Sequence, residues 1–155
     1  MLGECIAEGR HGRVKAVVSS DLSRAADTAR IIAEKLGIPV DEVKLASELR
    51  ERHMGRLQGM TRKEAAEKDP MAWNAFMNSR NNDAFKVPGG GESYEDMWDR
   101  AVGYMERMAA SVASESSKAI DVDEGGDDGR IVVVTHGGRA RQPTNHQRPT
   151  THILN

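Results

Sequence analysis

The chain has 155 residues, of which 30% are charged and 38% hydrophobic, and its net charge is −2. This length favours one domain with a real hydrophobic core. The balanced charge, with no long basic block, argues against binding to nucleic acid or to a membrane surface, and no apolar run is long enough for a membrane span. The single cysteine, Cys5, allows no intrachain disulfide and favours a cytoplasmic setting.

The first clear pattern is a strand followed by a helix. The short run Lys15-Ala16-Val17-Val18 predicts a strand. From Leu22 to Leu36 the apolar residues recur at spacings of three and four, which predicts an amphipathic helix, and Gly37 is placed to end it. The run Val43-Lys44-Leu45 predicts a second, brief strand.

Helices are expected in the middle of the chain. Thr61 and Glu64 form a capping-box pattern for a short helix that stops near Asp69-Pro70, and Met71 to Met77 predicts another. Ser93 is placed to cap a longer helix. The apolar face expected for that helix consists of Met97, Ala101, Tyr104, Met105, Met108 and Val112.

The last third of the chain contains one more strand between two polar segments. Residues 114–130 are polar and acidic and predict a disordered insertion; a calcium loop is the alternative, but Gly125-Gly126 breaks its ligand spacing. The apolar run Ile131 to Val134 is typical of a strand buried on both faces of a parallel sheet. Residues 142–155 predict a disordered tail. Strands alternating with helices indicate an α/β domain with helices on both faces of a parallel sheet.

Two residues are expected at the carboxyl ends of strands, where such sheets bind ligands. Arg24 follows the first strand and stands one turn into a helix, whose unpaired N–H groups and dipole attract phosphate. His136 follows the last strand, and Gly137-Gly138 behind it would let an anion approach the backbone. The alternatives are a capped helix with a solvated arginine, and a histidine that only caps its strand.

A dense charged segment supplies a candidate acid. The segment Glu51 to Gly59 combines a carboxylate, positive charges and two glycines. Protonating a leaving oxygen beside bound phosphate needs such a combination. The alternative is a solvated charged face, which is the usual role of such a run.

These residues resemble the histidine phosphatase superfamily, and within it the cofactor-dependent phosphoglycerate mutase branch. The resemblance rests on blocks that follow one another over roughly residues 14–141: Ser20-Asp21-Leu22-Ser23-Arg24-Ala25 with Thr28-Ala29, Glu51-Arg52-His53-Met54-Gly55 with Leu57-Gln58-Gly59, Gly91-Glu92-Ser93, and Val134-Thr135-His136-Gly137-Gly138 with Arg141. It implies a three-layer α/β/α fold with a mostly parallel sheet. It also implies phosphoryl transfer through a phosphohistidine on a small phosphorylated metabolite, without a metal; a bisphosphoglycerate primer is implied only for a true mutase.

The resemblance also implies roles for individual residues. Arg24 would hold the transferred phosphate, Glu51 would donate and accept the proton, and His136 would be the second histidine of the pocket. Arg62 stands where mutases carry a substrate-binding lysine, and Met54 stands where mutases usually have tyrosine. Both departures leave a glycolytic mutase, which is an isomerase, and a phosphatase, which is a hydrolase, as open alternatives.

The family's nucleophile is a histidine in an Arg-His-Gly motif, and the chain contains Arg10-His11-Gly12. Only Arg13 separates this motif from the next strand, whereas a parallel crossover needs a dozen or more residues. We therefore expect that His11 is not the nucleophile and that the nucleophile strand lies upstream of Met1. That strand would pair beside the one ending at His136, so its absence would expose Ile131 to Val134. Residues 1–141 are then interpreted as a partial domain, truncated at the N-terminus.

Two other classes of function stay open. A chain without its nucleophile would be an inactive protein that binds phosphate esters, or an incomplete gene-model fragment. Metal binding through His136, His146 and His152 is disfavoured, because these histidines show no ligand motif.

Overall fold

A computed structural model of the protein describes residues 14–79, 82–116 and 130–136. These residues pack as two compact units. The first unit contains residues 14–50, 104–116 and 130–136, and the second contains residues 51–79 and 82–103. The expected domain boundaries stay a prediction, and the Arg10-His11-Gly12 motif and the expected tail lie outside the described residues.

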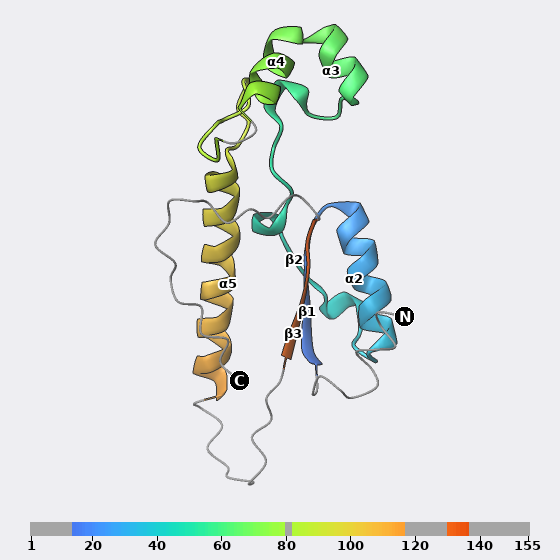
Figure 1. The fold of residues 1–155 in the computed structure, drawn as a ribbon. Coiled ribbons are helices and arrows are strands. Elements are labelled where there is room, and N and C mark those ends of the chain that lie inside the picture. The colour runs from blue at the N-terminus through green and yellow to red at the C-terminus, as the bar shows by residue number, and fades with distance from the viewer. Residues whose placement is uncertain (1–13, 80–81, 117–129, 137–155) are drawn as a thin grey trace. The chain divides into compact units, whose positions relative to one another are not determined.

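The first unit is built on a parallel sheet of three strands in the order β2-β1-β3 (Figure 1). The central strand β1 spans Val14–Ser20, and its neighbours are β2 (Lys44–Ala46) and β3 (Arg130–Val134). The register pairs Ser20 with Ala46 of β2, and Ser19 with Val134 of β3. All three strands therefore end at the same edge of the sheet.

Helices cover both faces of this sheet. Successive strand residues point to opposite sides, so neighbouring residues of β1 pack against different helices. On one face, Val17 packs with Ala29 and Ala33 of helix α2 (Ser23–Lys35). On the other face, Val18 lies in a cluster with Tyr104 of helix α5 (Tyr94–Ser116). The first unit is thus a three-layer α/β/α arrangement (Figure 1), as expected from the sequence.

Two sequence predictions for this unit need correction, and another is confirmed in part. Residues Ile131 to Val134 pack into the clusters on both faces of the sheet, as predicted, but they are only half-buried, since β3 is an edge strand of the sheet that the described residues form. Met105, expected on the buried face of α5, is 39% exposed. Helix α5 also continues to Ser116, so the first residues of the expected acidic insertion are helical.

The second unit is mainly helical and contains η3 (Gly55–Leu57), α3 (Arg62–Lys68), α4 (Pro70–Asn78) and the first turns of α5. The predicted capping box of α3 is confirmed: the Glu64 N–H donates to Thr61 Oγ1 at 3.2 Å and the Thr61 N–H donates to Glu64 Oε2 at 3.0 Å. The buried core of this unit consists of Leu57, Ala65, Ala72 and Val87.

Candidate active site

The junction between β1 and α2 leaves the start of the helix without a side-chain cap. The N-cap residue is Leu22, whose side chain cannot accept a hydrogen bond, and no capping bond from a side chain to α2 is found among the described residues. Ser20 Oγ accepts from the Leu22 N–H at 3.3 Å, one residue before the helix. The alternative interpretation of this junction, a helix start capped by a polar side chain, is therefore wrong. An uncapped helix start with Arg24 in its first turn is suited to an anion.

His136 lies at the same edge of the sheet, because β1 and β3 are parallel neighbours. Its Nε2 atom is 2.9 Å from the Oγ atom of Ser20, which is fully buried. The preceding residue, Thr135, donates its hydroxyl to the Leu49 carbonyl oxygen at 3.0 Å. These bonds hold the end of β3 against the end of β1 and orient the imidazole. Two of the predicted site residues, Arg24 and His136, thus both follow strands that end at this edge of the first unit, and the Arg24 side chain there is exposed.

An ion pair fixes the loop between β1 and α2. Arg50 binds both oxygens of Asp21, with Nε donating at 2.6 Å and Nη2 at 2.5 Å. This hydrogen-bonded guanidinium lowers the pKa of Asp21 below its usual range. The two residues lie 29 positions apart, and no local sequence pattern indicates their pairing.

In the second unit, the candidate acid Glu51 belongs to a segment that the start of α5 holds by its backbone. The Glu51 carbonyl oxygen accepts from Arg100 Nη2 at 3.2 Å. Two residues later, the His53 N–H donates to Glu92 Oε2 and the His53 carbonyl oxygen accepts from the Glu92 N–H, both at 2.9 Å. The Glu51 side chain is exposed. The backbone around the acid is therefore anchored on both sides of Arg52.

A glycine packs this segment against the loop before α5. Gly55 has a φ of +53°, and the Arg56 N–H donates to the Pro88 carbonyl oxygen at 2.8 Å. A Cβ on Gly55 would overlap the Pro88 carbonyl oxygen and lie 2.9 Å from the Val87 carbonyl oxygen. Only glycine fits here, both for its backbone conformation and for lack of space.

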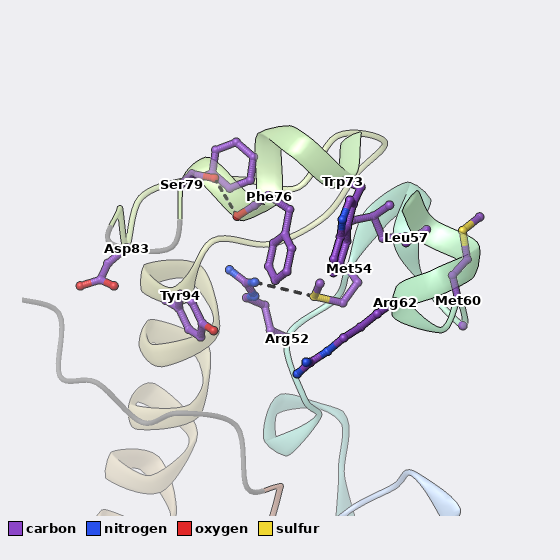
Figure 2. Close-up of a pocket in the computed structure, with 13 residues that line it drawn as sticks. Arg52, Met54, Leu57, Met60, Arg62, Trp73, Phe76, Ser79, Asp83 and Tyr94 are labelled. Atoms are coloured by element: carbon purple, nitrogen blue, oxygen red, sulfur yellow. Dashed lines mark hydrogen bonds between the residues drawn. The ribbon is translucent and has the colours of Figure 1, made fainter. Parts of the chain in front are cut away.

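A cavity of about 500 Å³ lies within the second unit (Figure 2). Its lining combines polar side chains, namely Arg52, Arg62, Ser79 and Asp83, with a set of apolar and aromatic ones: Met54, Leu57, Met60, Trp73, Phe76, Phe85 and Tyr94. A cavity that joins aromatic walls to a few charged and polar groups is typical of a small-molecule site. The predicted substrate residue Arg62 begins α3 and is exposed.

Arg52 is the most buried charged residue of this lining, at 7% exposure. Its guanidinium carbon lies 3.9 Å from the ring centre of Tyr94 and 5.4 Å from that of Phe76 (Figure 2). Burial lowers the pKa of Arg52 below its usual value. Among the described residues no carboxylate forms an ion pair with Arg52, and its Nη2 donates to the Met54 sulfur at 3.7 Å, which is a weak acceptor.

The family model of the histidine phosphatase superfamily, branch 1, matches residues 3–147 of this chain. The chain belongs to this superfamily. A metal-independent phosphoserine phosphatase of Arabidopsis thaliana is 42% identical over 133 residues, which cover 86% of this chain and 48% of that protein. Phosphoglycerate mutase-like protein 4 of the same plant is 38% identical over 138 residues, which cover 89% of this chain and 52% of that protein.

The fold of this superfamily member agrees with solved structures. The complex of a mycobacterial glucosyl-3-phosphoglycerate phosphatase with inorganic phosphate is 30% identical, with a TM-score of 0.61 over 87% of this chain and 57% of that one. This likeness confirms the predicted α/β fold. The chain spans about half the length of the curated relatives it matches.

The superfamily residues predicted from the sequence fall into both units. Arg24 and His136 lie in the first unit, whereas Glu51 and Arg62 lie in the second, so their joint action stays a prediction. Arg52, Ser20, Glu92 and the Asp21–Arg50 pair escaped the sequence reasoning as site residues. For Arg52 the only signal was its place in the Glu51-to-Gly59 segment, because its aromatic neighbours come from distant parts of the sequence.

The described part of the chain shows neither a metal-binding cluster nor a membrane-spanning helix. No group of three or more histidine, cysteine or carboxylate side chains there could hold a metal ion. None of the helices there has the length and hydropathy of a membrane span.

Proposed function

We propose that this chain supplies the phosphate site and the proton donor of a phosphatase that hydrolyses small phosphomonoesters bearing a carboxylate. The relatives named as phosphatases support hydrolysis, and the Arabidopsis relative's description as metal-independent supports a reaction without a metal. The family resemblance supports a phosphohistidine intermediate. A cytoplasmic setting stays a prediction.

The proposed chemistry divides between the two units. Arg24, the start of α2 and His136 bind the phosphoryl oxygens, and Ser20 orients the imidazole of His136. Glu51 protonates the leaving alcohol when the phosphoryl group moves to a histidine. Glu51 then accepts a proton from the water that releases phosphate.

The buried guanidinium of Arg52 is the main support for a substrate that bears a carboxylate. Among the described residues Arg52 has no ion pair with a carboxylate, so its buried charge is costly, and an anionic ligand would relieve that cost. The aromatic rings of Phe76 and Tyr94 beside Arg52 would shield the interaction from water and strengthen it. Two of the relatives are named after phosphoserine and glucosyl-3-phosphoglycerate, and both of these phosphate compounds have a carboxylate.

Met54 and Arg62 favour a phosphatase over a mutase. Both line the cavity, and both depart from the residues that the mutase branch usually carries at these positions. A mutase must retain and reorient a phosphorylated intermediate, whereas a phosphatase only has to admit water. The thioether of Met54 offers no hydroxyl with which to hold a sugar acid in place.

The test compares phosphoserine with phosphoethanolamine, which lacks only the carboxylate. We expect kcat/KM to favour phosphoserine by roughly 30-fold, the equivalent of about 2 kcal/mol for a charged hydrogen bond. Arg52→Met should abolish this preference. Lys63→Met, which removes one exposed positive charge from the same unit, should leave it unchanged. Equal turnover of the two substrates by the unaltered protein would refute the carboxylate assignment.

A second experiment on the same protein identifies the histidine that attacks the phosphate. Alkaline quenching during turnover preserves the acid-labile phosphohistidine, and mass spectrometry then locates it; His11→Ala tests the expectation that this residue does not attack. Phosphorylation lost only in His11→Ala would show that expectation to be wrong. Vanadate binding without turnover of any phosphomonoester would favour an inactive phosphate-binding protein instead.

A further inference from the structure

The pair Glu92 and Arg100 has a geometry that a simple surface salt bridge lacks. Arg100 donates to both oxygens of the Glu92 carboxylate, from Nε at 2.7 Å and from Nη2 at 2.8 Å. The side chains are only 25% and 22% exposed, respectively. The guanidinium lowers the pKa of Glu92, so the carboxylate stays charged in mildly acidic solution. The pair is therefore a rigid two-pronged unit at the start of α5.

This rigid unit is bonded to the backbone on both sides of Arg52. Arg100 holds the Glu51 carbonyl oxygen, and Glu92 bonds to both the N–H and the carbonyl oxygen of His53. These contacts fix one peptide group at Glu51 and two at His53. A carboxylate that only stabilised its helix would not need to reach the backbone of a residue 39 positions earlier.

We infer that Glu92 and Arg100 are positioning residues for the proton donor Glu51. This inference rests on the proposed function, because it takes Glu51 as the general acid. Neither residue contacts the reacting atoms in this role; they fix the peptide from which the Glu51 side chain projects. A general acid contributes only when its proton lies within hydrogen-bond reach of the leaving oxygen, and a displacement of about 1 Å can cost 100-fold in rate.

Helix α5 supports this role through its own beginning. The Asp96 N–H donates to Ser93 Oγ at 3.0 Å, and the Ser93 N–H donates to Asp96 Oδ2 at 2.9 Å, which caps the helix immediately after Glu92. The helix then carries Arg100 two turns further along the same face. Glu92 and Arg100 are therefore spaced by a capped helix and not by a loop.

Two substrates that differ in their leaving group distinguish a loss of Glu51 positioning from a loss of folded protein. Glu92→Gln keeps the shape of the side chain but removes the charge that binds Arg100, and Arg100→Lys keeps the charge but removes the fork. We expect kcat/KM for an alkyl phosphate such as phosphoserine to fall roughly 30-fold in both variants. Turnover of p-nitrophenyl phosphate should fall less than about threefold, because its leaving phenolate needs no proton. Loss of folded protein would lower both rates equally.

The control is Lys63→Met, which removes a different ion pair of the second unit, with Glu67 at 4.0 Å in α3, and leaves the cap of α5 intact. It should preserve both rates. Glu92→Gln combined with Arg100→Lys should be no slower than either single variant, because the pair acts as one unit. Equal losses for the two substrates, or additive losses in the double variant, would overturn the inference.

A readout without turnover separates this inference from the proposed function. In the unaltered protein, NMR detects the His53 amide and the Glu51 carboxyl carbon. We expect faster hydrogen exchange at His53 and a shifted Glu51 resonance in Glu92→Gln, and neither change in Lys63→Met. If the unaltered protein hydrolyses no phosphomonoester but these changes occur, the proposed function fails and the positioning holds. An unchanged Glu51 resonance would overturn the positioning itself.

Discussion

The Nε2 atom of His136 lies 2.9 Å from the Oγ atom of Ser20, although 116 positions separate the two residues in the sequence. The parallel pairing of β1 with β3 makes this contact, because both strands end at the same edge of the sheet. Ser20 is fully buried, so its hydroxyl stays in place. The contact gives the imidazole one fixed neighbour before any ligand arrives.

Ser20→Ala should lower kcat/KM about tenfold, because the imidazole of His136 loses its hydrogen bond to the Ser20 hydroxyl. Ser19→Ala is the matched control, since Ser19 is equally buried but its hydroxyl donates to the Ser20 carbonyl oxygen at 2.9 Å. Both variants should lose about 1 kcal/mol in free energy of unfolding. Steady-state rates and urea unfolding on both proteins check this, and equal rate losses in the two would contradict it.

Arg24→Ala should weaken the binding of vanadate by about 2 kcal/mol, because a charged hydrogen-bond donor leaves the phosphate site. Arg30→Ala removes the same charge from the same helix, where Arg30 pairs with Asp27 at 2.8 Å on the surface, and should leave the affinity unchanged. Titration calorimetry with vanadate measures both. The same affinity for the two variants would show that net charge, and not the position of Arg24, attracts the anion.

The carboxylate of Glu64 should make α3 sensitive to acid. The Thr61 backbone N–H, together with Lys68 and the Thr61 hydroxyl, lowers the pKa of Glu64 from 4.5 to about 2. Since the pKa is depressed in the folded state, the stabilisation is complete above pH 4.5 and disappears as the pH falls toward 2. Glu64→Gln should therefore be less stable than the unaltered protein near neutral pH and equally stable in strong acid.

Urea unfolding at a series of pH values tests this dependence. Glu67→Gln serves as the control, because Glu67 lies in the same helix and only reaches Lys63 at 4.0 Å. Its effect on the free energy of unfolding should be small at every pH. A Glu64→Gln deficit that persists in strong acid would mean that the amide disturbs the cap itself.

Gly55→Ala should destabilise the protein by about 3 kcal/mol or more, because a methyl group there meets the Pro88 carbonyl oxygen in addition to the strain of a positive φ. Gly59→Ala is the matched control: its φ is +76°, but nothing lies within 4 Å of the added carbon. It should cost about 1 kcal/mol, from backbone strain alone. Thermal unfolding compares the two variants, and equal losses would refute the packing argument.

The sequence predicted elements wherever local chemistry decides them. The three-and-four spacing before Leu36 placed α2, and the Thr61 and Glu64 pattern placed the start of α3. Both signals act within one or two turns of helix, so tertiary contacts need not intervene. The α/β architecture followed from the alternation of these elements.

The remaining features depend on contacts between distant residues. The Asp21–Arg50 pair, the stacking of Arg52 on Tyr94 and the anchoring of His53 by Glu92 leave no periodic trace in the sequence. At the start of α2 the sequence instead indicated a contact that does not form. Polar residues suggested a cap there, but Ser20 Oγ accepts from the Leu22 N–H and lies beside His136 instead.

The order of the strands in the sheet has a consequence for synthesis on the ribosome. The central strand β1 meets β2 soon after both are made, but its other neighbour, β3, is made only after the described residues of the second unit. Until then one edge of β1 lacks its partner, so the nascent first unit is exposed to chaperones and to aggregation. The described residues of the second unit, in contrast, are nearly contiguous and can fold before translation reaches β3.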